Sequence, residues 1–270
     1  MDSRDIERFL AEDEGFGDIT TALLPDVEGS ANVITHEEGV VAGLSEAQSI
    51  FSYHNLVTAP LCCDGDSIKK DDIILRVVGA VRDILVTERV ALNVLCRMSG
   101  IATITRRCVE AAGTVAVAAT RKTTPGFRRY EKKAVAIGGG DPHRYSLSEA
   151  YLFKDNHLKV MSAEDALQQK TFFTKKVEIE VESVDECVKA AELGANIIMF
   201  DNMDVEQITA AVSKLKERNL RGNVLLEASG GIRPDNVRKY AATGVDVLSL
   251  GYLTHSSRWL DFSLELDAPD

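Results

Sequence analysis

The sequence predicts an α/β protein whose second part is a parallel β/α barrel, preceded by a separate N-terminal domain. After Gly113, short apolar segments alternate with helical segments, and this alternation predicts a parallel sheet. Polar residues follow each apolar segment, and in a closed barrel the carboxyl ends of all strands meet at one mouth. In an open doubly wound sheet, only the polar residues at the switch point of the strand order would meet. No G-x-G-x-x-G motif follows the first strand, which argues further against a dinucleotide-binding fold of that kind.

Composition limits the class of protein. The 270 residues suffice for one large domain or two smaller ones, and 45% hydrophobic with 27% charged residues is ordinary for a soluble protein. No apolar run reaches the ~18 residues of a membrane span, and the charged N-terminus lacks a signal core, so we expect a cytoplasmic protein without membrane partners. The formal net charge of −11 argues against a nucleic-acid partner. The five cysteines lack metal-site spacing, which predicts reduced thiols.

The N-terminal domain is expected over residues 1–102, as a mixture of short helices and strands. Ile6, Phe9 and Leu10 share one side of the first predicted helix, and Ser45 is the predicted cap of the second. The elements, in order, are a helix at 2–12, extended chain at 30–44, a helix at 45–53, short strands within 65–79, and a helix at 84–112 that is broken near Ser99–Gly100.

The catalytic barrel domain is expected over residues 103–270. Its predicted strands are 115–119, 151–153, 177–181, 196–200, 224–227 and 245–250. Its predicted helices are 184–192, 204–218 and 234–243, with a last helix from 256 to about 266. We allow for the C-terminal helix, at about 256–270, packing back on the N-terminal domain.

Three short blocks, at 120–126, 138–144 and 154–157, form a dense cationic cluster. The charges repel one another in an otherwise acidic chain unless an anion lies among them. A solvated basic face is the alternative, but the first and third blocks follow apolar runs, and glycines and prolines mark tight loops where backbone approaches a ligand. The pattern therefore favours an anion-binding site, whose cationic residues are Arg121, Lys122, His143, Arg144, Lys154 and His157.

The last two strand-to-helix connections are glycine-rich. Ser229, Gly230 and Gly231 follow one strand, and Gly251 follows the next. Barrels often hold phosphate in these two loops, where glycines let backbone N–H groups face the anion. A simple β-turn explains either loop alone, whereas the pair of loops favours a phosphate site.

Two carboxylates, Glu180 and Asp201, end neighbouring predicted strands opposite the cationic blocks. Acids beside phosphates indicate Mg²⁺, which is held by one or two carboxylates together with substrate phosphates. The alternative is a pair of salt bridges to Lys122 and Lys154, and the two interpretations are compatible.

Ordered motifs run along almost the whole chain: 12–21, Thr87–Asn93, Ser99–Thr103, the three cationic blocks, Glu178–Val181, Phe200–Asn202, Glu227–Gly231 and Leu253–Ser256. Together they resemble the motifs of the quinolinate phosphoribosyltransferase family. Departures are small: Asp141 stands where many relatives carry Asn, and Phe153 where a smaller aliphatic residue is common.

The resemblance implies a reaction and a fold. Quinolinate and phosphoribosyl pyrophosphate would give nicotinate mononucleotide, pyrophosphate and CO2, a step in NAD biosynthesis. The fold would be an incomplete α/β barrel with an N-terminal open sandwich of α+β type. Mg²⁺ would accompany the phosphoribosyl donor, and no organic cofactor is implied.

The resemblance also implies roles for individual residues. Arg121, His143, Arg144 and Lys154 would hold quinolinate, together with Arg89 reaching the partner subunit's site. A homodimer would then be the minimal active unit, and a hexamer is the higher oligomer that the resemblance allows. Lys122, Glu180 and Asp201 would be catalytic. The phosphoribosyl pyrophosphate site would comprise Thr120, Lys122, Glu180, Asp201, Ser229, Gly230, Gly231, Leu250, Gly251, Tyr252 and His255.

Two alternatives remain open at this point. One is a relative of the ModD-like branch, associated with molybdenum transport, acting on another substrate. The intact Lys154–His157 block favours the quinolinate enzyme over that branch. The other is a non-catalytic protein that binds an anion in the same pocket.

Overall fold

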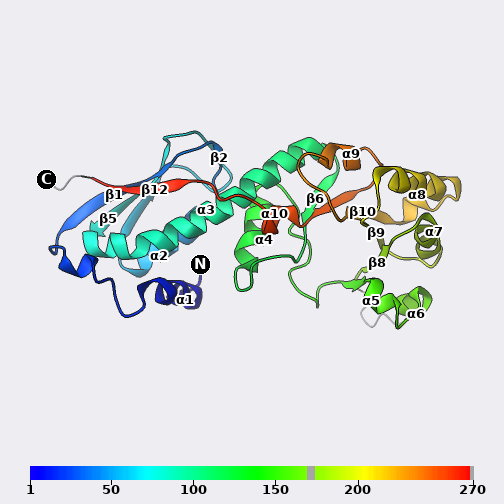
Figure 1. The fold of residues 1–270 in the computed structure, drawn as a ribbon, viewed down its shortest axis with the longest axis horizontal. Coiled ribbons are helices and arrows are strands. Elements are labelled where there is room, and N and C mark those ends of the chain that lie inside the picture. The colour runs from blue at the N-terminus through cyan, green and yellow to red at the C-terminus, as the bar shows by residue number, and fades with distance from the viewer. Residues whose placement is uncertain (169–173, 268–270) are drawn as a thin grey trace. The chain divides into compact units, whose positions relative to one another are not determined.

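A computed structural model describes residues 1–168 and 174–267, and these form two compact units, each with its own core (Figure 1). The first unit comprises Met1–Thr103 with Ser257–Asp270, and the second comprises Ile104–Ser256. Ile74 and Leu75 are fully buried in the first unit, as are Ile198 and Phe200 in the second. The chain passes from one unit to the other within helix α3 (Val81–Ala112).

The first unit is built on a four-stranded antiparallel sheet with the strand order β12-β1-β5-β3. Helix α1 begins after Asp2, whose carboxylate accepts from the Asp5 N–H, and it buries Ile6 and Leu10. The elements are α1 (Ser3–Glu14), η1 (Thr21–Leu23), β1 (Glu28–Thr35), β2 (Gly39–Val40), α2 (Leu44–Tyr53), β3 (Val57–Pro60), β4 (Ser67–Ile68), β5 (Ile73–Ala80) and β12 (Phe262–Leu266), with β2 and β4 paired as a small second sheet.

The C-terminal segment is a strand, so the helix predicted from Ser256 to about Leu266 is wrong. Strand β12 pairs antiparallel with β1, with Val33 opposite Leu264. Residues 262–266 alternate apolar and polar side chains, and a period of two suits a strand with one buried face. The predicted range to 270 also includes 268–270, which lie outside the described residues.

Two helix predictions in this unit need correction. Helix α3 runs through Ser99–Gly100 without a break, because the absent side chain at Gly100 makes room for the Arg258 carbonyl. The Ser99 hydroxyl bonds the backbone of Ala42 on both sides, accepting at 3.0 Å and donating at 3.1 Å. Helix α2 is not capped by Ser45, because its N-cap is Gly43.

The second unit contains a six-stranded parallel sheet among its described residues, with the strand order β6-β11-β10-β9-β8-β7. The first strand neighbours the last, and the remaining strands follow in chain order, which is the order of a barrel opened between its first two strands. The predicted incomplete α/β barrel is confirmed. The strands are β6 (Ala116–Ala119), β7 (Tyr151–Phe153), β8 (Val177–Val181), β9 (Ile197–Asp201), β10 (Leu225–Ser229) and β11 (Val247–Leu250).

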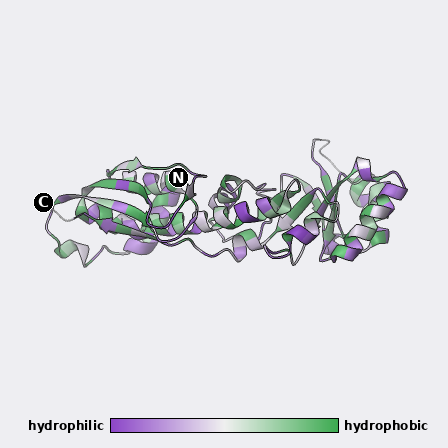
Figure 2. Ribbon diagram, turned by 90° about the horizontal axis from the view of Figure 1, so that it is seen from above, coloured by the Kyte–Doolittle hydropathy of each residue, from purple (hydrophilic) through white to green (hydrophobic). Residues whose placement is uncertain are grey.

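Amphipathic helices connect these strands. Figure 2 shows hydrophobic and hydrophilic residues alternating along them, and α8 buries Ile208, Ala211, Val212 and Leu215. The helix predicted at 234–243 is shorter, because the Asn236 side chain first accepts from the Arg233 N–H. The helices are α4 (Arg128–Ile137), α5 (Asp155–Leu158), α6 (Ala163–Gln168), α7 (Val184–Glu192), α8 (Val205–Glu217), η2 (Arg221–Asn223), α9 (Val237–Ala241) and α10 (Tyr252–His255).

A search of the described helices of both units finds none that combines the length and apolar character needed to cross a membrane.

Candidate active site

A pocket of about 280 Å³ lies at the carboxyl ends of the parallel strands in the second unit. Residues of the three cationic blocks and the strand-end acids meet there, together with Ser229 of β10 and Ser249 of β11. Of the residues proposed for the site, the structure brings together Thr120, Arg121, Lys122, His143, Arg144, Lys154, Glu180, Asp201 and Ser229 as lining residues, with Ala119, Leu152, Met199, Glu227 and Ser249 beside them.

The register of the sheet explains why the acids face this pocket. Met199 on β9 is the partner of Glu180 on β8 and of Glu227 on β10, so these three share one level of the sheet. One level further along, Ser229 is the partner of Asp201. Because alternate residues of a strand point to the same face, both levels present polar groups to the interior.

Two guanidinium groups make up the cationic wall. The Nε of Arg121 is buried and, among the described residues, has no hydrogen-bond partner. Burial lowers the pKa of Arg144, and the nearby charge of Arg121 lowers it further. Two like charges that are partly withdrawn from water destabilise each other, so this wall suits an anionic ligand.

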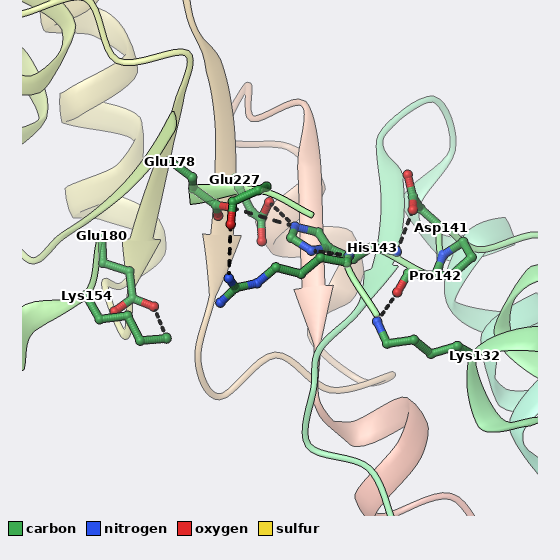
Figure 3. Close-up of polar contacts among 10 residues, drawn as sticks. Lys132, Asp141, Pro142, His143, Lys154, Glu178, Glu180 and Glu227 are labelled. Carbon is green, nitrogen blue, oxygen red and sulfur yellow. Dashed lines mark hydrogen bonds and ion pairs between the residues drawn. The ribbon is translucent and has the colours of Figure 1, made fainter. Parts of the chain in front are cut away.

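Lys154 and Glu180 form an ion pair on the other side of the pocket (Figure 3). Lys154 directly follows β7, and its backbone N–H donates to the His157 ring at 2.9 Å. Burial raises the pKa of Glu180, while the hydrogen bond from Lys154 acts in the opposite direction. The lysine charge therefore favours an ionised carboxylate in this partly buried position.

The His143 ring faces two buried glutamates, Glu178 and Glu227 (Figure 3). Its Nε2 is 3.3 Å from an oxygen of Glu227 and 4.0 Å from one of Glu178. The hydrogen bond to Glu227 raises the pKa of His143 despite its burial. Glu178 and Glu227 are almost completely buried, at 1% and 2% exposed.

Glu178 and Glu227 were missing from the residues proposed for the site. Burial and the charge of Glu227 raise the pKa of Glu178 to about 8. The strand 177–181 alternates so that Glu178 and Glu180 point to the same face, and this spacing was the available signal. Glu227 belongs to a motif that supported the resemblance, but only contact with His143 indicates its role.

The two glycines that follow β10 differ in the space around them but share a positive φ. Gly230 has a φ of 92°, and a Cβ there would lie 2.8 Å from the Asn202 backbone nitrogen. Gly231 has a φ of 63° and open space where a side chain would stand. Both therefore need glycine, one for room and both for backbone conformation.

The loop after β11 lies against Lys122. A Cβ on Gly251 would be 2.9 Å from the His255 ring and 3.1 Å from the Lys122 side chain. The Thr254 hydroxyl donates to the Lys122 carbonyl at 2.7 Å, which fixes this neighbourhood. Lys122, Gly251 and His255 are thus brought together as expected for one binding region.

Three of the proposed residues stand apart from this arrangement. Arg89 belongs to the first unit, on α3, where its half-exposed side chain contacts Glu88 at 3.5 Å. Leu250 is fully buried in the core, so only its backbone is available to a ligand. Tyr252 is the first residue of α10 and is partly exposed.

Comparison with known families and proteins identifies what kind of protein has this architecture. Residues 18–99 match the N-terminal domain of quinolinate phosphoribosyl transferase, and residues 101–265 match its C-terminal domain. A probable nicotinate-nucleotide pyrophosphorylase (carboxylating) of Archaeoglobus fulgidus is 49% identical, over 93% of this chain and 98% of the relative. The human nicotinate-nucleotide pyrophosphorylase (carboxylating) is 40% identical, over 86% and 80%.

Solved structures agree with these matches. NadC from Streptococcus pyogenes superposes with a TM-score of 0.91 at 38% identity, covering 99% of this chain and 96% of the other. The nicotinate-nucleotide pyrophosphorylase of Francisella tularensis gives a TM-score of 0.91 at 36% identity, covering 98% and 95%. The chain therefore belongs to the quinolinate phosphoribosyl transferase family.

Proposed function

We propose that this enzyme transfers the phosphoribosyl group of phosphoribosyl pyrophosphate to quinolinate and removes one carboxylate, giving nicotinate mononucleotide for NAD biosynthesis. The observation that carries the proposal is that Arg121 and Arg144 lie partly buried in one pocket at the mouth of the α/β barrel. The barrel is that of the family to which the chain belongs. Quinolinate carries two adjacent carboxylates, and arginine holds carboxylates through two parallel hydrogen bonds.

The transfer step forms a bond between the pyridine nitrogen and the ribose C1′ while the bond from C1′ to pyrophosphate breaks. Positive charge develops on the sugar as pyrophosphate leaves. Glu180 and Asp201 line the same pocket and would stabilise that charge, while Lys122 would contact the donor. No covalent enzyme intermediate is required, because holding both substrates in line supplies much of the rate enhancement.

Loss of CO2 leaves an electron pair on the ring carbon, which then takes up a proton. The guanidinium groups of Arg121 and Arg144 and the ammonium of Lys154 would stabilise this negative charge, since all three line the pocket. The two steps therefore use different groups of one pocket: acids for the sugar and cations for the pyridine ring.

The phosphates of the donor are assigned to the two glycine-rich loops. Ser229, Gly230 and Gly231 would hold the 5′-phosphate with Gly251 and His255, and backbone N–H groups at such turns suit phosphate oxygens. Glu180 and Asp201 offer the oxygen ligands that Mg²⁺ prefers, so they fit a metal ion that neutralises pyrophosphate.

We also propose a homodimer with shared active sites and a cytoplasmic location. Arg89 supports the first, because its half-exposed guanidinium lies on the part of α3 that belongs to the first unit and is available to a partner subunit. The five cysteines support the second, because all are free thiols, as expected in a reducing compartment.

One assay tests the proposed function. The protein is incubated with quinolinate, phosphoribosyl pyrophosphate and Mg²⁺, and nicotinate mononucleotide is measured together with released CO2. We expect turnover that depends on both substrates. Tight quinolinate binding without product would favour an anion-binding protein, and turnover with nicotinate in place of quinolinate would favour a transferase of different substrate specificity.

A further inference from the structure

Two cations of helix α4 hold the short segment Pro142–Tyr145, which carries His143 and Arg144. The Lys132 ammonium donates to the first carbonyl of this segment (Figure 3), and the Arg128 guanidinium donates to its last carbonyl at 3.0 Å. His143 and Arg144 stand between these two carbonyls, and both line the pocket. Two of the proposed quinolinate ligands are therefore tied to α4 on either side.

The same turn of α4 also holds the first cationic block. Residues three and four apart in a helix are neighbours on its surface, so Arg128, Glu131 and Lys132 stand close together. The buried Glu131 carboxylate accepts from the Thr124 N–H at 3.1 Å and from the Thr124 hydroxyl at 2.9 Å. Arg128 Nε donates to the Thr123 hydroxyl at 2.9 Å. One turn of α4 thus contacts both of the blocks that supply the arginines of the pocket.

Lys132 is completely buried in this arrangement. Burial lowers its pKa to about 8, and the charge of Arg128 lowers it further. Withdrawing an ammonium group from water is costly, so lysines are seldom buried without a partner. Its Nζ contacts the Pro142 carbonyl and lies 5.4 Å from the centre of the Tyr145 ring. Lys132 is not among the described residues that line the pocket, so it acts on a substrate only through the segment that it holds.

The peptide group between Pro142 and His143 is held at both of its polar atoms (Figure 3). Its carbonyl oxygen accepts from Lys132, and its N–H donates to Asp141 Oδ1 at 2.6 Å. The φ of His143 is 53°, in the left-handed region that residues other than glycine seldom occupy. Such a conformation persists where the surroundings fix it, as is common in ligand-binding sites.

We propose that Lys132 is a positioning residue for quinolinate, which fixes the peptide group before His143 and, with Arg128, holds His143 and Arg144 ready for the substrate carboxylates. His143 and Arg144 are the ligands, and Lys132 acts through them. This inference rests on the proposed function, because it names the support for the quinolinate pocket.

The first test replaces Lys132 by Met, which keeps the length of the side chain but removes the donor. We expect the KM for quinolinate to rise about tenfold, while the KM for phosphoribosyl pyrophosphate changes less than about twofold. The melting temperature should stay unchanged or rise, because removal of a buried charge offsets the lost hydrogen bond. Equal increases in both KM values, or a lowered melting temperature with unchanged KM values, would overturn the proposal.

Lys214→Met is the matched control, because it makes the same substitution on another helix of the second unit. Lys214 lies on an exposed face of α8, where it pairs with Glu217 at 3.5 Å. We expect both KM values of this variant to equal those of the native enzyme. An increase in the KM for quinolinate as large as that of Lys132→Met would remove the special role of Lys132.

A binding measurement needs no turnover and so separates this inference from the proposed function. Calorimetry with benzene-1,2-dicarboxylate, an unreactive dianion, should show about tenfold weaker binding to Lys132→Met than to the native protein. Weaker binding in the variant, together with a native protein that makes no nicotinate mononucleotide, would end the proposed function and leave the positioning role. Unchanged binding in the variant would overturn the positioning role even if the native enzyme turns over quinolinate. A native protein that shows neither binding nor turnover would overturn both.

A second pair of variants covers the case in which Lys132→Met fails to fold. Arg128 is only partly buried, so Arg128→Met removes the contact at the other end of the segment with less disturbance of the core. We expect about fivefold weaker binding of benzene-1,2-dicarboxylate. Arg128→Lys keeps a cationic N–H donor and should recover most of this affinity. Native affinity in Arg128→Met, or equal losses in the two variants, would overturn the proposal.

Discussion

Lys154 and Glu180 form an ion pair between two neighbouring parallel strands, and each belongs to a different half of the proposed chemistry. Lys154 is assigned to quinolinate, whereas Glu180 is assigned to the sugar and its metal ion. Under this proposal the lysine charge would be shared between a buried carboxylate of the protein, Glu180, and an incoming carboxylate of the substrate. This contact links the two substrate regions.

Replacing Lys154 by Ala should weaken quinolinate binding by about ten- to a hundredfold, because a charge-assisted hydrogen bond is lost. Binding of phosphoribosyl pyrophosphate should fall less, since Glu180 remains in place. Equilibrium binding of each substrate by calorimetry measures both. Lys159→Ala is the matched control, because Lys159 pairs with Asp155 on an exposed face of α5. Equal losses for the two substrates would contradict this division of the pocket.

Replacing Arg121 by Met should stabilise the ligand-free protein while reducing quinolinate binding. Burial lowers the pKa of Arg144 and the nearby charge of Arg121 lowers it further, so we expect the two guanidinium groups to destabilise each other before substrate arrives. We expect a gain of about 1 kcal/mol in unfolding free energy, measured by urea denaturation, as is common where a site is strained for function. A variant that loses both stability and affinity would argue against like-charge repulsion in the pocket.

Replacing Gly230 by Ala should impair binding of phosphoribosyl pyrophosphate and destabilise the fold by about 1–3 kcal/mol. The added methyl group would meet Asn202 at a φ of 92°, so both space and backbone conformation oppose it. Gly222→Ala is the control, because its site is open and requires no positive φ. Donor KM values and melting temperatures of the two variants provide the comparison, and similar behaviour would exclude a special role for Gly230.

His143 should contribute stability at low pH that disappears as pH rises. Glu227 raises the pKa of His143 above its ordinary value near 6.5, so the folded state binds this proton more tightly than the unfolded state. The contribution is complete below about pH 6.5 and is lost as pH passes through the raised pKa. We expect His143→Gln to cost more unfolding free energy at pH 5.5 than at pH 9 in urea denaturation. A cost that is independent of pH would contradict the ionic contact with Glu227.

Mixing Arg89→Ala with Lys154→Ala subunits should restore activity if active sites are shared. In a twofold dimer that contains one subunit of each variant, one active site would carry both substitutions and the other would carry neither. Random exchange of equal amounts should then recover about a quarter of native activity. A steady-state assay before and after exchange measures this, and complete exchange without recovery would refute the role of Arg89 in the partner's site.

Much of the barrel follows from the sequence because apolar strands and strand-end polar residues are local signals. Helix α7 matches its predicted range of 184–192, and residues that follow β6 and β7 meet Glu180 of β8 and Asp201 of β9 in one pocket. The C-terminal strand was mistaken for a helix because its stability comes from pairing with β1, more than 200 residues away in the chain. Gly100 likewise resembles a helix break until the chain that packs against it is known.

The buried acids of the site likewise show what the sequence alone could not predict. Glu178 and Glu180 are equivalent in a strand pattern, yet one is buried near His143 and the other pairs with Lys154. The difference depends on depth in the barrel, which is a property of the whole sheet. Glu227 becomes informative only through a residue 84 positions away, His143.

The sheet of the second unit opens between β6 and β7, and His143 and Arg144 lie on the connection between α4 and β7 that borders this opening. This connection contacts β10 through the His143 ring and the Glu227 carboxylate. Neighbouring strands of the sheet are instead joined by a row of backbone hydrogen bonds. We expect the rim to widen and narrow there by small side-chain movements, with the paired strands unchanged. A flexible rim of this kind would let the bulky mononucleotide product leave through the same entrance by which the flat dicarboxylate substrate enters.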